Sequence, residues 1–222
     1  MRAASAPARR WRVPKLAVYV AGFVPAVWTF YLGLVDRLGP EPIKALEQAL
    51  GLWSLRFLLL CLMISPLRRA AGVDLLRYRR ALGLLAFYYA ALHLAAYVAL
   101  DHGFDWPAIL RDILKRPYVT IGMAAFIILV PLAATSTNAA IRRLGGKAWA
   151  RLHKLVYVAA VLAAAHFLLI VKSWPAEPLL YAAATAALLA VRAIAAPRRR
   201  RTAPASPDPA SKGVVIPGRP QA

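Results

Sequence analysis

ALGLLAFYYAALHLAAYVAL, residues 81–100, and RLHKLVYVAAVLAAAHFLLIV, residues 151–171, are the two most informative stretches of this 222-residue chain. Each is mostly apolar, and each is long enough to cross a bilayer as a helix, which takes about 20 residues. The first contains His93, and the second contains His153 and His166. An ionisable side chain at bilayer depth is costly, so it usually faces the interior of a helix bundle and has a function there.

The composition of the whole chain supports a location in a membrane. Hydrophobic residues make up 61% of the chain and the mean hydropathy is +0.56, whereas soluble domains are typically about 45–50% apolar. The formal net charge of +20 is of a kind that also occurs in nucleic-acid-binding proteins. Here, however, the basic residues alternate with apolar segments of spanning length, which is typical of the positive-inside arrangement. We therefore expect membrane lipid, and no nucleic acid, around this chain.

Six apolar segments predict an all-α membrane protein, a six-helix transmembrane bundle. They lie at about 16–35, 51–65, 81–100, 118–134, 151–171 and 179–196. The second segment is short and is expected to extend back toward Leu46. Pro25 is expected to kink the first helix unless neighbouring helices compensate for the lost hydrogen bond. The first segment is too long for the core of a signal peptide, which indicates a retained anchor.

The charges of the connections predict the topology. The N-terminus, the connections after the second and fourth segments, and residues 198–201 are strongly basic, whereas the other connections are nearly balanced. Because Lys and Arg favour the cytoplasmic side, both termini are expected in the cytoplasm. The chain then divides into a basic cytoplasmic N-terminus (1–15), a six-span domain (16–196) and a cytoplasmic tail (197–222). The tail is rich in Pro, Ala, Ser and Arg, a composition typical of disorder.

The depths of two histidines indicate a haem site. The third and fifth segments run in the same direction, so His93 and His166 are expected at similar height on two different helices, toward the periplasmic side. Neutral imidazole is a ligand for haem iron, and a bundle can hold a haem between facing helices. Cys61 is the only cysteine, so a covalent CxxCH attachment is excluded and the haem would be b-type. Alternatively, each histidine bonds only to a neighbouring helix.

His153 is expected near the cytoplasmic face. It lies thirteen residues before His166, which corresponds to roughly 20 Å along a helix. That interval suits a second redox centre, but thirteen residues is about 3.6 turns, so two imidazoles on a straight helix would not share a face. Either the two cofactors are approached from different sides or the helix is irregular. Simple contact with lipid headgroups is an alternative for His153.

Several arginines are candidate partners for anionic groups of a cofactor. Arg56 lies inside the second segment, where it either snorkels or pairs with an anion such as a haem propionate. Arg77, Arg79 and Arg80 lie at the expected cytoplasmic mouth, level with His153. They could bind the propionates of a second haem, a flavin phosphate or lipid phosphate, although the positive-inside rule alone accounts for them. His102, at the start of a connection, is expected to be solvated.

The sequence has no motif for nicotinamide binding or for substrate chemistry. It has no GxGxxG after a strand, no P-loop and no evident nucleophile–base pair. These features favour an electron-transfer subunit over a catalytic one, with the chemistry left to cofactors and a partner. Two alternatives stay open: a self-contained ferric-chelate or quinone-linked cytochrome b reductase, and a non-redox transporter or scaffold.

Four segments resemble a known family. They are SLRFLLLCLMISPLRR (54–69), LHLAAY (92–97), RPYVTIGMAAFIILVPLAATS (116–136) and WARLHKLVYVAAVLAAAHF (149–167). These segments look like the MsrQ family, formerly YedZ, the haem-binding membrane subunits of bacterial MsrPQ systems. That family is part of the ferric-reductase-like membrane domains. The resemblance covers about residues 16–196.

The resemblance implies a specific role in the bacterial inner membrane. It implies haem b and FMN as cofactors, with electrons coming from the quinone pool or a cytoplasmic flavin reductase. The acceptor would be MsrP, a periplasmic molybdopterin enzyme that reduces methionine sulfoxide in proteins. By motif match, His93, His153 and His166 are the haem-iron ligands. The wider ferric-reductase pattern has two histidines on each of two helices, and Arg80 or Arg79 stands where the fourth is expected.

Overall fold

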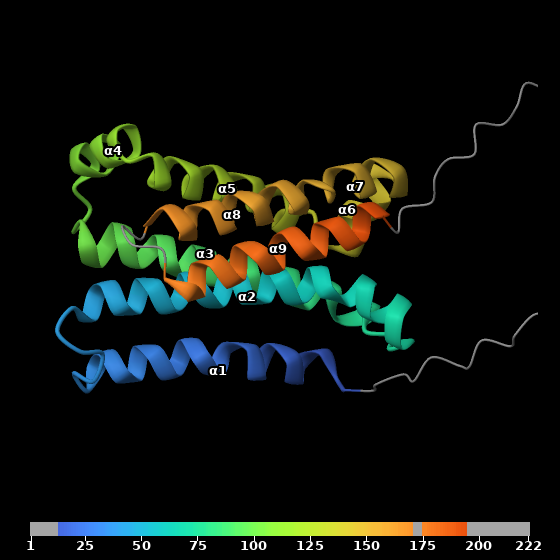
Figure 1. The fold of residues 1–222 in the computed structure, drawn as a ribbon, viewed down its shortest axis with the longest axis horizontal. Helices are drawn as coiled ribbons and strands as arrows, with labels where there is room; N and C mark the ends of the chain where they lie inside the picture. The colour runs from blue at the N-terminus through green and yellow to red at the C-terminus, as the bar shows by residue number, and fades with distance from the viewer. Residues whose placement is uncertain (1–12, 171–174, 195–222) are drawn as a thin grey trace, which may run out of the picture.

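The computed structural model describes residues 13–170 and 175–194. These residues form an elongated bundle of helices without a strand (Figure 1). The arginines of the N-terminus up to residue 12 and the tail from residue 197 on, for which topology and disorder are predicted above, lie outside the described residues. In chain order the helices are α1 (Lys15–Leu34), α2 (Pro42–Ala71), α3 (Arg79–Ala96), α4 (Trp106–Lys115), α5 (Pro117–Ala134), α6 (Asn138–Leu144), α7 (Gly146–Leu152), α8 (Leu155–Ile170) and α9 (Ala176–Ile194).

The predicted all-α, six-span architecture is confirmed. Six helical stretches are long and apolar enough to cross a membrane: Lys15–Leu34, Pro42–Ala71, Leu76–Asp101, Pro117–Ala134, Gly146–Ile170 and Ala176–Ile194. The third stretch joins a 3₁₀ turn (Leu76–Tyr78), α3 and a π-helical turn (Tyr97–Asp101). Because the number of spans is even, Lys15 and Ile194 lie at the same end of the bundle (Figure 1).

The second span begins well before the predicted residue 51. Helix α2 starts at Pro42, a residue whose fixed φ suits the first turn, and it ends at Ala71, where Gly72 in the left-handed conformation caps it. The charged residues near its start lower the local hydropathy. Leu46 and Leu50 are nevertheless buried against the bundle. The start of the helix is therefore amphipathic, and the helix begins before the continuous apolar segment.

Two pairs of neighbouring helices dominate the packing. Helix α2 packs along α3, and α5 packs along α8, with α1 on the outside of the first pair and α9 against α8 and α2. The largest fully buried side chains come from α2 and α3: Leu50, Leu58, Leu62, Leu85 and Tyr89. The outward faces carry many exposed apolar residues, as a surface in contact with lipid does.

Two of the proline residues within the spans, Pro25 and Pro66, lie beside backbone groups that bond to side chains of other helices. Helix α1 continues through Pro25, and the buried Tyr89 hydroxyl donates to the Gly22 carbonyl (2.7 Å) and accepts from the Ala26 N–H (2.9 Å). In α2, Pro66 has no N–H to donate to the Leu62 carbonyl, one turn earlier, and Arg192 of α9 donates to that carbonyl instead. Both contacts satisfy backbone groups where no water is available.

Candidate haem site

His93 of α3 and His166 of α8 lie next to each other. Their imidazole centroids are 6.2 Å apart and the rings are inclined at 72°. A metal–imidazole nitrogen bond is about 2 Å, and an imidazole centroid lies about 1 Å from its nitrogens. Two imidazoles on opposite sides of one metal ion therefore need centroids about 6 Å apart. The similar height expected for these two histidines is confirmed, and their spacing fits one metal ion between them.

Each of these imidazoles is held through Nδ1. The His93 Nδ1 lies 2.8 Å from the Glu47 carbonyl oxygen, and the His166 Nδ1 lies 2.6 Å from the Tyr118 carbonyl oxygen. Because a carbonyl can only accept, Nδ1–H is the donor in both pairs. This fixes the tautomer in which Nε2 carries the free lone pair. Metal-bound histidines are typically oriented by such a bond.

A glycine makes room for each ring. A Cβ added at Gly51 would lie 3.3 Å from the His93 Nδ1, and one added at Gly122 would lie 2.7 Å from the His166 Nδ1. Gly51 follows Glu47 by four residues, and Gly122 follows Tyr118 by the same interval. Each imidazole thus rests on one turn of the neighbouring helix, between a carbonyl acceptor and a glycine. The pairs α2–α3 and α5–α8 repeat the same arrangement.

His153 is not brought to this pair. It occupies the break between α7 and α8, and a turn at residues 153–154 separates the two helices. Its ring stacks on Trp149 (centroids 3.9 Å apart, 26°), and its Nε2 lies 3.1 Å from the Thr135 Oγ1. The fifth span is therefore irregular at His153, as one of the two predicted alternatives requires.

A cavity of about 410 Å³ adjoins His153. It lies between α2, α3, α5, α7 and α8, and its lining includes Arg79, Arg80, Lys154 and Trp149. Arg79 donates to the Ser65 hydroxyl (3.1 Å), and Arg80 donates to the Asn138 side-chain oxygen (2.8 Å). Its volume is in the range of small-molecule sites. Arg77, expected with these two arginines, is not among the lining residues and has its guanidinium 5.0 Å from the Tyr78 ring.

Arg56 is held by groups of the protein. Its Nε lies 2.7 Å from the Tyr181 hydroxyl, its guanidinium is 3.7 Å from a Glu177 carboxylate oxygen, and it lies 4.8 Å from the Trp53 ring. The anion beside Arg56 in this structure is thus a carboxylate of α9, near the end of the bundle that holds His93 and His166.

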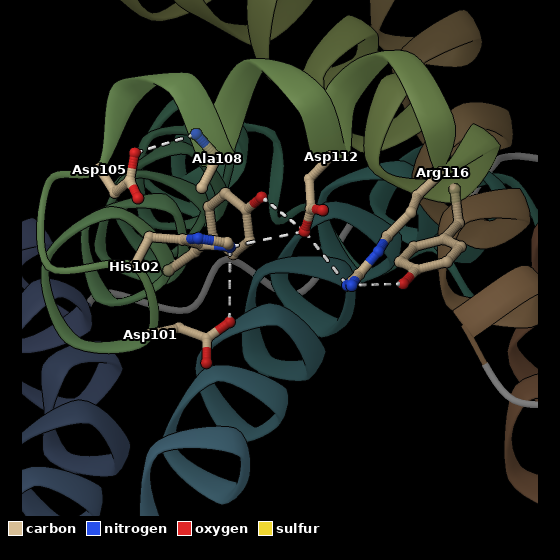
Figure 2. Close-up of polar contacts among 8 residues, drawn as sticks. Asp101, His102, Asp105, Ala108, Asp112 and Arg116 are labelled. Carbon is tan, nitrogen blue, oxygen red and sulfur yellow. Dashed lines mark hydrogen bonds and ion pairs between the residues drawn. The ribbon is translucent and has the colours of Figure 1, made fainter.

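The expectation that His102 is solvated is wrong. Its side chain is 16% exposed, and its Nε2 lies 3.5 Å from an Asp112 oxygen and 3.7 Å from an Asp101 oxygen. Figure 2 shows Asp112, on α4, pointing toward both His102 and Arg116, whose guanidinium is 3.1 Å away. The reason is α4, a ten-residue helix that places Asp112 beside His102 and whose charged residues keep it from appearing as an apolar segment.

Comparison with known proteins identifies the family. Residues 50–164, a range that includes His93 and His153 and ends two residues before His166, match the family described as "Ferric reductase like transmembrane component". Together with the six apolar helices, this match defines a multi-pass membrane protein of the ferric-reductase-like class.

Curated relatives narrow the assignment. The chain is 57% identical over 188 residues to proteins of Brucella ovis, Brucella canis and Brucella suis, covering 85% of this chain and 84% of each relative. Each relative is named protein-methionine-sulfoxide reductase heme-binding subunit MsrQ. The chain belongs to the MsrQ family.

Proposed function

We propose that this chain binds one b-type haem between His93 and His166 and transfers electrons to a periplasmic methionine-sulfoxide reductase. The observation that carries the proposal is the pair of imidazoles 6.2 Å apart, each with Nδ1 bonded to a backbone carbonyl. The relatives' name, a haem-binding subunit of a protein-methionine-sulfoxide reductase, supports both the ligand and the partner. The partner we propose is MsrP, a molybdopterin enzyme.

In this proposal the protein supplies ligands, orientation and a dry environment. A bound haem would take up and release one electron at a time. The carbonyls of Glu47 and Tyr118 hold the two imidazoles through Nδ1, which would leave Nε2 of each free to bind the haem iron. Arg56 would exchange its contact with Glu177 for a haem propionate. The attachment is non-covalent, because the single cysteine, Cys61, cannot form a CxxCH motif.

We further propose that electrons enter through the cavity beside His153. A flavin or quinone ring could stack there on Trp149. Arg79, Arg80 and Lys154 would then face the phosphate of the flavin or the oxygens of the quinone. FMN is the cofactor proposed for this cavity, and the quinone pool or a cytoplasmic flavin reductase is the proposed donor. His153 then acts beside this cofactor, or as a ligand of a second haem, and not on the haem of His93.

The proposed location is the bacterial inner membrane, with both termini in the cytoplasm. Among the described residues, the end of the bundle with His153 carries mostly Arg and Lys, whereas the end with α4 has a mixture of acids and bases. This difference supports the positive-inside orientation. In it, residues 1–15 and 197–222 are cytoplasmic and residues 16–196 are the membrane domain.

Single substitutions of the histidines test this proposal. His93→Ala and His166→Ala are each expected to abolish the low-spin haem spectrum of the purified protein, because each removes one of the two imidazoles that would hold the iron. His153→Ala is expected to keep that spectrum and to slow reduction by the donor. His102→Ala is the matched control, since His102 lies at the same end as the pair without facing it. A full haem spectrum in both His93→Ala and His166→Ala would refute the ligand assignment.

A further inference from the structure

Helix α4 presents an apolar stripe that nothing in the described residues covers. Trp106, Leu110 and Leu114 are spaced four residues apart and are 63%, 58% and 77% exposed. Phe104, just before the helix, is 58% exposed and lies against Trp106 (centroids 6.4 Å apart). Residues at this spacing share one face of a helix. Three large apolar side chains on one face of a short helix, with a fourth just before it, mark an interaction surface.

The opposite face of α4 is fixed to the bundle. Ile109 is buried, and Asp112 lies 3.1 Å from Arg116 and 3.5 Å from both the Tyr97 hydroxyl and His102 (Figure 2). Asp105 accepts from the Ala108 N–H and so caps the helix start (Figure 2). The two acids of the helix region are therefore engaged in local contacts. The orientation of the apolar stripe, away from the bundle, follows from these contacts.

We propose that α4 is an in-plane helix that rests in the phospholipid interface, on the side of the membrane where His93 and His166 lie. Three observations point to lipid as the occupant. Exposed apolar side chains occur on both sides of the junction between the third span and α4, because Leu100, at the end of that span, is 48% exposed and lies only four residues before Phe104. Tryptophan, here Trp106, favours the membrane interface.

The third observation is charge complementarity. Arg111 and Lys115 of α4 are exposed and suit the phosphates of lipid headgroups, whereas the exposed Asp105 caps the start of the helix. An amphipathic helix with an apolar face and flanking cations is typical of a helix that lies in the plane of the interface. Such an attachment holds the ends of the third span and of α5, which supply His93 and the Tyr118 carbonyl. The proposal does not depend on haem binding.

Site-directed spin labelling in proteoliposomes of phosphatidylcholine and phosphatidylglycerol tests this proposal. Single cysteines replace Leu110 and Leu114 in the stripe, Arg111 beside it, Glu41 in the aqueous connection at the same end, and Ile127 on the lipid-exposed side of α5. The natural Cys61 is buried, and unsubstituted protein serves as the blank. Accessibility to oxygen and to a water-soluble nickel chelate is measured by electron paramagnetic resonance, after circular dichroism has verified the helix content of each variant.

The expected result is a graded depth. Labels at Leu110→Cys and Leu114→Cys should be several-fold less accessible to nickel than the label at Glu41→Cys, and shallower than the label at Ile127→Cys. The label at Arg111→Cys should lie between the stripe and the aqueous reference. Nickel accessibility of the stripe equal to that of Glu41→Cys would overturn the proposal and leave this face open for a protein partner. Depth equal to that of Ile127→Cys would overturn the in-plane orientation.

Discussion

Gly122 determines how closely the His166 imidazole can approach the backbone of α5. A methyl group at this position would stand 2.7 Å from the His166 Nδ1 and 2.8 Å from its Cε1, both closer than real contacts allow. The ring would have to leave the Tyr118 carbonyl, so Nε2 would lose its orientation. Gly122→Ala is therefore expected to weaken haem binding by about 10–100-fold, the usual effect of losing a ligand's supporting contact.

Two other glycines supply graded comparisons for this prediction. An added Cβ would lie 3.3 Å from the His93 Nδ1 at Gly51 but 3.8 Å from its nearest neighbour, the Cys61 Sγ, at Gly83. Haem titration and the low-spin spectrum should therefore rank Gly122→Ala as most affected, Gly51→Ala as less affected and Gly83→Ala as close to the wild type. Equal haem affinity in Gly122→Ala and Gly83→Ala would contradict the role given to Gly122.

At the scale of single residues, the histidines were predictable and their supports were not. Counting residues along two apolar segments is enough to bring His93 and His166 to a similar height. The groups that hold their Nδ1 atoms are backbone carbonyls of Glu47 and Tyr118, and any residue type carries a carbonyl. The sequence therefore does not indicate which carbonyls hold the histidines. The role of Gly51 and Gly122 can be recognised only when the helix that packs against each of them is known.

At the scale of elements, α1 is joined to the bundle through Tyr89. Its hydroxyl contacts Gly22 and Ala26 in the turn of α1 that contains Pro25. Tyr89→Phe would leave these backbone groups without that partner in a region without water, at a cost of about 1–3 kcal/mol. Reversible unfolding by denaturing detergent in bicelles measures this loss. Tyr88→Phe, on the neighbouring residue with a side chain 40% exposed, is expected to be neutral. Equal stability of the two variants would contradict the prediction.

Helix α9 is joined to α2 through a carbonyl that a proline leaves without a donor. Arg192 donates to the Leu62 carbonyl, and Pro66 has no N–H to do so. Arg192→Ala should destabilise the protein, and Pro66→Ala should lower the cost of that substitution, because residue 66 then donates to the same carbonyl. We expect a coupling of about 0.5–1.5 kcal/mol in a double-mutant cycle, the usual net value of one hydrogen bond. Strictly additive effects would contradict this contact.

The six spans were predictable because length and hydropathy report them directly, but the short helices between them were not. Helix α4 has only ten residues, and its charged residues lower the average hydropathy of the connection. Its signal is the spacing of Trp106, Leu110 and Leu114, which a search for apolar runs does not detect. Missing α4 also caused the error at His102, because Asp112 of that helix is one of the groups that enclose it.

At the scale of the whole molecule, the two ends of the bundle differ in charge and in contents. One end has α6, α7, His153 and its cavity, with mostly basic side chains around them, and the other end has α4 and the pair of His93 and His166. Lys and Arg favour the cytoplasmic side. Electrons are therefore expected to enter at the end with the His153 cavity and to leave at the end with α4.

Proteoliposomes with one defined orientation test this direction. Protein reduced from the side of the His153 cavity should be re-oxidised, as followed by its visible absorbance, when MsrP and a peptide with methionine sulfoxide are added on the side of α4. The reason is distance, since the imidazole pair lies near the α4 end whereas His153 lies roughly 20 Å farther along the span. Omission of the sulfoxide peptide is the control. Re-oxidation only when MsrP is added on the opposite side would reverse the orientation and remove the electron-transfer role assigned to the α4 end.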